Sequence, residues 1–189
     1  MDRLGGLLRG ASEARGASQE PVGRRFLHRI PWLFVGLVGA LLSADIVGAF
    51  EEQLKETLVL AFFVPGIVYL ADAVGTQTET VVIRGLSVGV GLRQMVRPEL
   101  LSGLLMGLAL SSVFFPVALL RWGDTDVAIA VSLSLFAACS VATLIAMVLP
   151  WAIRRLGKDP AFGSGPLATV IQDLLSIFVY FQIASSIVA

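Results

Sequence analysis

Four acidic side chains stand within, or at the edges of, long apolar runs of this sequence. They are Asp45, Asp72, Glu79 and Asp173. A carboxylate near the middle of a membrane-spanning helix costs about 2.5–3.5 kcal/mol on insertion scales, and such residues usually face a pathway or a bound ion. The sequence places no Lys or Arg in the middle of these runs to neutralise them. Protonation and cation binding therefore remain as explanations for the four acids.

Polar residues form a regular pattern in the last apolar run, residues 165–188. Thr169, Asp173, Ser176 and Tyr180 recur at steps of three and four residues, so they share one face of a helix. The alternative is that the hydroxyls bond only to their own helix backbone. Four polar residues on one face favour a pathway that these side chains line, with Asp173 as its charged member.

A second polar stretch occupies the later half of an earlier run. Asp72 and Glu79 are seven residues apart and share a helical face, with Gly75, Thr76 and Gln77 between them. Small residues there let a helix or a hydrated ion approach the backbone. The alternative is that this half has already left the membrane as an exposed linker. We expect the two acids to be metal ligands, because hard cations such as Mg²⁺ bind oxygen, and the three residues between them to line the path.

Asp45 lies toward the end of the first apolar run. It is either a solvated residue near the lipid head groups or an acid that lines the mouth of a pore. The acidic segment that follows, residues 51–56, allows the same two interpretations, since a negative ring also occurs at the mouths of cation pathways.

The elements that must position these residues are apolar segments of membrane length. The chain has 189 residues, of which 56% are hydrophobic and 15% charged, whereas a soluble domain carries about 25% charged residues. Five apolar runs, at residues 30–50, 57–83, 100–120, 127–151 and 165–188, are each long enough for a transmembrane helix of roughly 20 residues. We therefore predict an all-α integral membrane protein with five transmembrane helices.

Charge and composition exclude several other classes of protein. The formal net charge is zero, so nothing indicates a nucleic-acid partner. With one cysteine and one histidine, a zinc or transition-metal cluster is not expected. Basic residues gather in the N-terminal tail, in segment 84–99 and in the turn at 154–158, whereas segments 51–56 and 121–126 are acidic. This alternation predicts a cytoplasmic N-terminus and an external C-terminus.

The segments between the spans carry further expectations. Residues 1–28 are predicted to be a disordered, basic cytoplasmic tail, and residues 84–99 a basic connector in the membrane interface. Asp159 before Pro160 is typical of a helix N-cap. Gly103 and Gly107 recur at helical spacing, as in a packing face between membrane helices, and form a weak dimerisation pattern.

Several short motifs together resemble the transmembrane domain of the MgtE family of magnesium channels and transporters. In chain order they are RIPWL at 29–33, VP at 64–65, VGTQ at 74–77, VVIRGL at 81–86, DPA at 159–161, SGPL at 164–167, the acid at 173 and YF at 180–181. The resemblance covers residues 29–189 and implies a homodimer with one pore between the protomers that passes hydrated Mg²⁺. It identifies Asp173 as the Mg²⁺-binding acid of the pore, places Thr169 beside that site one turn earlier, and places Gly165 along the pore two turns earlier.

The sequence also departs from that family. Members often carry Gly-Gly-Asn-x-Gly-x-Gln in the second helix, where residues 71–77 here read ADAVGTQ. The Asn is absent, Asp72 is added, and Glu79 stands where an uncharged residue is usual, which leaves the ion selectivity open. The family's cytosolic sensor and CBS domains do not fit within residues 1–28, so gating of the family type would need a separate cytosolic regulatory protein.

Three other functions remain open at this point. The chain could be a proton- or sodium-coupled cation carrier, or a non-transporting membrane subunit that binds a sensor protein through its basic connector. It could also be an intramembrane aspartyl protease that uses Asp72 and Asp173, because two carboxylates sharing a proton are the chemistry such an enzyme needs. The transport hypothesis, with no enzymatic activity and with the chain in the cell membrane, accounts best for all four acids.

Overall fold

The computed structural model describes residues 21–156 and 164–188, and in this part of the chain every regular element is a helix. Five helices are long and apolar enough to cross a membrane: α2 (Val22–Ala49), α4 (Val59–Ser87), α5 (Leu92–Trp122), α6 (Thr125–Arg155) and α7 (Ser164–Ile187). A short helix, α3 (Glu51–Glu56), joins the first two. The predicted all-α fold with five spanning helices is confirmed.

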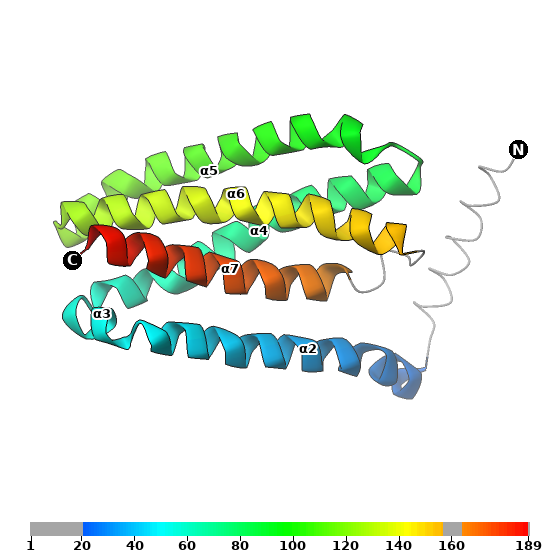
Figure 1. The fold of residues 1–189 in the computed structure, drawn as a ribbon, viewed down its shortest axis with the longest axis horizontal. Coiled ribbons are helices and arrows are strands. Elements are labelled where there is room, and N and C mark those ends of the chain that lie inside the picture. Colours follow the sequence, from blue (N-terminus) through cyan, green and yellow to red (C-terminus); the bar gives the residue numbers. More distant parts are fainter. Residues whose placement is uncertain (1–20, 157–163, 189) are drawn as a thin grey trace, which may run out of the picture.

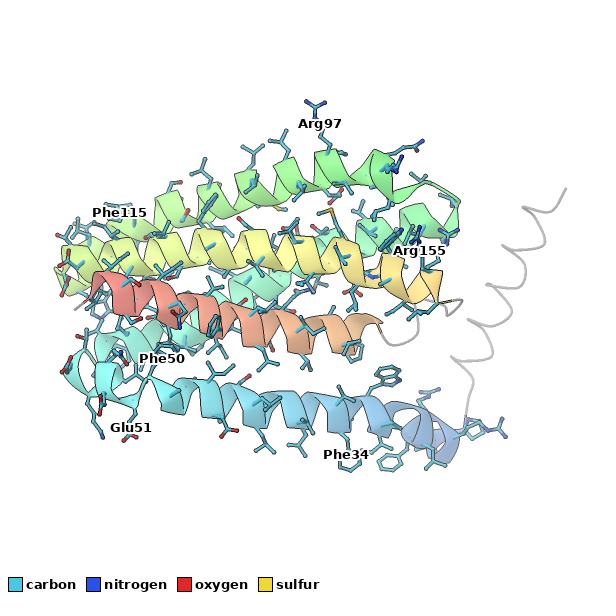
Figure 2. The ribbon with its side chains drawn as sticks, viewed as in Figure 1. Phe34, Phe50, Glu51, Arg97, Phe115 and Arg155 are labelled. Carbon is cyan, nitrogen blue, oxygen red and sulfur yellow. The ribbon has the colours of Figure 1, made fainter. Side chains whose placement is uncertain are left out.

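The five long helices run side by side, and each runs antiparallel to the one before it along the chain (Figure 1). Helix α6 lies in the middle and packs against α4, α5 and α7. More than half of its apolar span is buried, which makes it the core of the bundle. Helix α2 lies at the edge, where it packs against α7 and leaves most of its surface exposed. Phe34 projects from the outer face of α2, away from the other helices (Figure 2).

Small residues bring α5 and α6 close together. Gly103 faces the side chain of Thr143, and a Cβ on Gly107 would stand 3.3 Å from the main-chain oxygen of Phe136. Ser111, one turn further on, is buried and donates to the main-chain oxygen of Gly107 at 2.7 Å. The predicted packing face is therefore present, and within one chain it packs against α6.

The predicted connector at residues 84–99 is wrong for most of its length. Helix α4 continues to Ser87 and α5 begins at Leu92, so the turn is residues 88–91. Gly89 has φ +86°, a left-handed conformation that glycine adopts without steric cost. Met95 packs with Val82, Leu86 and Met147, and burial of this apolar cluster stabilises the first turn of α5.

Other helix ends also differ from the prediction. Helix α2 begins at Val22, eight residues before the predicted start of the first span, so the last part of the predicted tail is helical. The acidic segment 51–56 forms α3, in which Lys55 pairs with Glu51 at 2.7 Å. Asp124 caps α6, because its Oδ1 accepts from the backbone N–H groups of Asp126 and Val127 at 2.9 and 3.0 Å. The predicted tail at residues 1–20 and the predicted cap at Asp159 lie outside the described residues.

Candidate functional site

Helices α4 and α7 pack closely at Gly75 and Gln172. A Cβ on Gly75 would stand 2.7 Å from the amide carbon of Gln172 and 3.0 Å from its Nε2, so the absence of a side chain at position 75 lets the glutamine lie against the α4 backbone. The two helices are antiparallel, and this contact fixes how they face each other. Residues one turn before Gly75 lie opposite residues one turn after Gln172. Residues one turn after Gly75 lie opposite residues one turn before Gln172.

In this register Asp72 and Asp173 are about two residues, or roughly 3 Å, out of step along the two helix axes. Both side chains are half-buried, and their carboxylates lie close enough for the two charges to repel each other. Oδ1 of Asp72 is buried and has no hydrogen-bond partner among the described residues. Asp72 is about 20 Å along α4 from Val59 and about 20 Å from Ser87, so the pair lies near mid-depth. Two carboxylates at that depth, with no ion pair to a base among the described residues, are the kind of intramembrane acids that usually face a pathway or an ion.

The face of α4 beside this pair is polar and exposed in a single chain. Thr76 follows Asp72 by one turn and Thr80 follows by two, and both are exposed, as is Gln77. The hydroxyl of Thr80 donates to the main-chain oxygen of Thr76 at 2.8 Å, which satisfies only part of this surface. A polar stripe of this kind is costly against lipid hydrocarbon, so it needs water or protein in front of it.

Glu79 shares the face of Asp72 by sequence but not its exposure. It is 7% exposed, and its Oε1 has no hydrogen-bond partner among the described residues. On α7, Thr169 and Gly165 are half-buried and continue from Asp173 toward the start of that helix. The structure therefore places Asp173, Thr169 and Gly165 along one partly open line, with Glu79 packed inside the bundle.

Ser176 and Tyr180, which we expected to line the path, lie in the interior of the chain. Each is 1% exposed. The Tyr180 hydroxyl donates to the main-chain oxygen of Leu60 on α4 at 2.6 Å, and the Ser134 hydroxyl of α6 approaches the main-chain oxygen of Tyr180 at 3.5 Å. On the polar face of α7, Thr169 and Asp173 are thus partly exposed, whereas the residues beyond them are buried by packing.

Asp45 lies away from the other acids. Gly39 of α2 packs against Val170 of α7, and Asp45 comes six residues later, about 120° round the helix from that contact. Its side chain is exposed. The structure therefore does not bring Asp45 to Asp173 within one chain.

Gln172 is a site residue that sequence reasoning missed. It is 1% exposed, packs on Gly75, and carries an Oε1 with no hydrogen-bond partner among the described residues. A signal for it was present, because Gln172 comes three residues after Thr169 and four before Ser176, which places a long polar side chain on a helix of otherwise apolar character. Its neighbour Asp173 carries the charge, so the cost of a buried charge identifies Asp173 and not the neutral Gln172.

The described part of a single copy holds no cluster of three or more acids, histidines or cysteines that could bind a metal ion. Asp72 and Asp173 provide two carboxylates, whereas Mg²⁺ takes octahedral coordination and usually keeps several of its waters. The arrangement suits a hydrated ion that meets few protein ligands.

Comparison with known proteins places the chain in a family. A family model described as "MgtE: Divalent cation transporter" matches residues 64–183, which contain the Gly75–Gln172 contact and both acids of the pair. The chain belongs to the MgtE family. The resemblance drawn from the short motifs is therefore confirmed, and the chain is a multi-pass membrane protein of a transporter family rather than an enzyme.

Curated relatives agree with this assignment. A magnesium transporter MgtE of Bacillus subtilis is 34% identical over 165 residues, which cover 85% of this chain and 37% of that protein. A magnesium transporter MgtE of Thermus thermophilus is 32% identical over 164 residues, which cover 84% of this chain and 36% of that protein. The chain thus spans little more than a third of the length of these MgtE relatives.

Proposed function

We propose that this MgtE-family chain carries Mg²⁺ across the cell membrane as a homodimer, with Asp173 of both copies binding the hydrated ion. The observation that carries the proposal is the Asp72–Asp173 pair, half-buried at mid-depth with no ion pair to a base among the described residues. The names of the two relatives, both magnesium transporters, support Mg²⁺ as the ion.

The exposed polar face of α4 is the reason to expect a second copy. Thr76, Gln77 and Thr80 would meet hydrocarbon if one chain stood alone, at a cost of several kcal/mol per unsatisfied polar group. A symmetric partner that applies the same face would enclose these groups around a wet path. It would also bring a second Asp72–Asp173 pair to the axis, so that the ion meets four carboxylates through its own water shell.

The remaining site residues take different roles in this proposal. Thr169, one turn from Asp173, contacts the hydration shell of the ion, and Gly165 keeps the path wide. Thr76 and Gln77 line the path from α4. Ser176 and Tyr180 hold α7 in the bundle, as the hydrogen bond from Tyr180 to Leu60 indicates.

The charge distribution along the bundle supports a cytoplasmic N-terminus. Arg155 lies at one end of the bundle and Glu51 at the other (Figure 2). The end near Arg155 also carries Arg84 and Arg93, whereas the end near Glu51 carries Asp124. Basic residues in short loops favour the cytoplasmic side, and α2 begins on that side.

Mg²⁺ uptake into proteoliposomes that contain an ion-sensitive dye tests the proposal. Asp173→Ala and Asp173→Asn should each lower the initial uptake rate by about tenfold or more, since each removes a charge that attracts the ion in both copies. Asp45→Asn is the matched control, because Asp45 is exposed and lies about 120° round α2 from its contact with α7. If both Asp173 variants transport at the wild-type rate, Asp173 is not on the ion path.

Cross-linking tests the dimer independently of transport. In a Cys139→Ala background, Thr169→Cys should form a disulfide between two copies across the axis upon mild oxidation, because Thr169 lies on the proposed path. Leu101→Cys on α5 is the control, since Leu101 is 58% exposed on the opposite side of the bundle. Equal cross-linking at the two positions, or none at position 169, argues against the proposed axis.

A further inference from the structure

Three buried oxygens on α4 and α7 lack hydrogen-bond partners within the part of the chain that the structure describes. They are Oγ1 of Thr78, Oε1 of Glu79 and Oε1 of Gln172, and their residues are 1%, 7% and 1% exposed. Buried polar atoms are nearly always satisfied in folded proteins, because leaving one unpaired costs about as much as its desolvation. Three unsatisfied oxygens in one region indicate that something else occupies the space between them.

The contact between Gly75 and Gln172, together with helical spacing, brings the three residues near one another. Oε1 of Gln172 occupies the place where a side chain on Gly75 would begin. Thr78 and Glu79 come three and four residues after Gly75, and such neighbours on a helix have Cβ positions about 5–6 Å apart. The hydroxyl of Thr78 and the carboxylate of Glu79 can therefore reach the same point as the amide oxygen of Gln172.

The hydroxyls of Thr78 and of Ser132 on α6 are buried without a partner among the described residues, whereas several other buried hydroxyls are bonded. Ser134 donates to the main-chain oxygen of Ala130 at 2.6 Å, and Thr143 donates to that of Cys139 at 2.9 Å, each one turn back on its own helix. This is the ordinary arrangement for hydroxyls inside helices. Because Thr78 does not make such a bond, its oxygen is free to serve as a ligand.

The donor set identifies the chemical class of the ligand. All three atoms are hard oxygens, which suit alkali and alkaline-earth cations rather than transition metals. They bring one negative charge, from Glu79, and the next basic residue along α4 is Arg84, which is exposed. A single positive charge would leave the buried site neutral, whereas a divalent ion would leave an uncompensated charge inside the protein.

We infer that each copy binds one monovalent alkali cation, of sodium type, between Thr78, Glu79 and Gln172. The charged ligand of this site differs from those of the proposed Mg²⁺ site, since Glu79 lies seven residues, or about 10 Å, beyond Asp72 on α4. On α7, Gln172 adjoins Asp173. All three ligands come from one chain, so the site requires neither Asp173 nor a dimer. Its occupant neutralises Glu79 beside the α4–α7 contact, and Mg²⁺ uptake should therefore depend on the monovalent cation present.

Thermal unfolding of the purified full chain in nanodiscs tests the site. NaCl should raise the unfolding temperature by about 5 °C over choline chloride at equal ionic strength, as expected for a ligand well above its dissociation constant. Glu79→Gln should abolish this shift, and Thr78→Val should weaken it. Thr80→Val is the control that should retain the full shift, because Thr80 is exposed and bonded to its own helix.

Two further measurements separate this inference from the transport proposal. Asp173→Asn should lose Mg²⁺ uptake and keep the sodium-dependent shift, whereas Glu79→Gln should lose the shift. Equilibrium dialysis of the wild-type protein with radioactive Na⁺ should give one bound ion per chain. This measurement needs no variant, so it tests the site even if a substituted protein does not fold. Absence of bound sodium, or a wild-type stability that follows pH and is the same in sodium and choline, overturns the inference in favour of a proton on Glu79.

Discussion

The hydroxyl of Tyr180 on α7 donates a 2.6 Å hydrogen bond to the main-chain oxygen of Leu60 on α4. The bond joins residues 120 positions apart in the chain, and both residues are 1% exposed. Leu60 lies in the first turn of α4, five residues before the helix-internal Pro65. Tyr180 therefore holds the C-terminal half of α7 against the start of the second spanning helix, and the Mg²⁺ path proposed here does not pass through it.

Tyr180→Phe should destabilise the fold by about 1 kcal/mol, because it removes one buried hydrogen bond and keeps the ring. Thermal unfolding in detergent measures the change. Tyr69→Phe on α4 is the control, since Tyr69 is 71% exposed and should tolerate the loss of its hydroxyl. Transport per folded molecule should be unchanged in both variants. A Tyr180→Phe protein of normal stability with strongly reduced uptake would instead assign the hydroxyl to the path.

Gly75→Ala should be harmful although alanine is the better helix former. The new Cβ would overlap the side-chain amide of Gln172, which is 1% exposed and has little room to move aside, and overpacking of this kind costs about 1–3 kcal/mol. Gly66→Ala on the same helix is the control, because nothing lies within 4 Å of a Cβ there, and it should be neutral or stabilising by up to about 1 kcal/mol. Unfolding temperatures of the two variants compare the sites directly.

The double variant Gly75→Ala/Gln172→Ala examines the same contact from the other helix. Shortening Gln172 makes room for the Cβ, so the double variant should recover most of the stability lost by Gly75→Ala alone. Simple addition of the two single effects would show that the glycine is needed for a reason other than its contact with Gln172.

Gly107→Leu should destabilise the single chain rather than separate two copies. A Cβ at this position lies 3.2 Å from Cβ of Cys139 and 3.3 Å from the main-chain oxygen of Phe136, and the backbone atom cannot move aside. We expect a loss of at least about 2 kcal/mol. Gly36→Leu on α2, where nothing lies within 4 Å, should have little effect. Loss of the dimer on size-exclusion chromatography with light scattering, at an unchanged unfolding temperature, would contradict an intrachain role for Gly107.

The number and type of the helices could be predicted from the sequence because membrane length and hydropathy determine them. Their ends could not. Arg84 and Arg93 suggested a connector, but long basic side chains at helix ends can reach the interface while the helix continues. The contacts of Met95 with Val82 and Leu86, which join the two helix ends, are visible only once the chain is folded.

The charged residues of the candidate site could be predicted from the sequence, because a charge within a membrane span is costly. Which of the uncharged residues are exposed could not be predicted, because tertiary packing determines it. An acid within an apolar run is easily recognised, which is why Asp72 and Asp173 could be selected from the sequence. Helical spacing also put Ser176 and Tyr180 on the face of Asp173. That spacing shows which residues share a face, but not where the face turns from an open surface to the interior of the same chain, as it does beyond Asp173.

Asp72→Asn should raise the Mg²⁺ concentration for half-maximal uptake by about tenfold. The carboxylates of Asp72 and Asp173 lie close enough to repel each other, so a cation near one is attracted by both, and removing one charge forfeits on the order of 1.4 kcal/mol of that attraction. Asparagine keeps the size of the side chain, so the fold should be retained. Asp45→Asn removes an exposed charge on α2 and should leave the half-saturating concentration unchanged. A wild-type value for Asp72→Asn together with a large effect of Asp173→Asn would mean that Asp173 alone meets the ion.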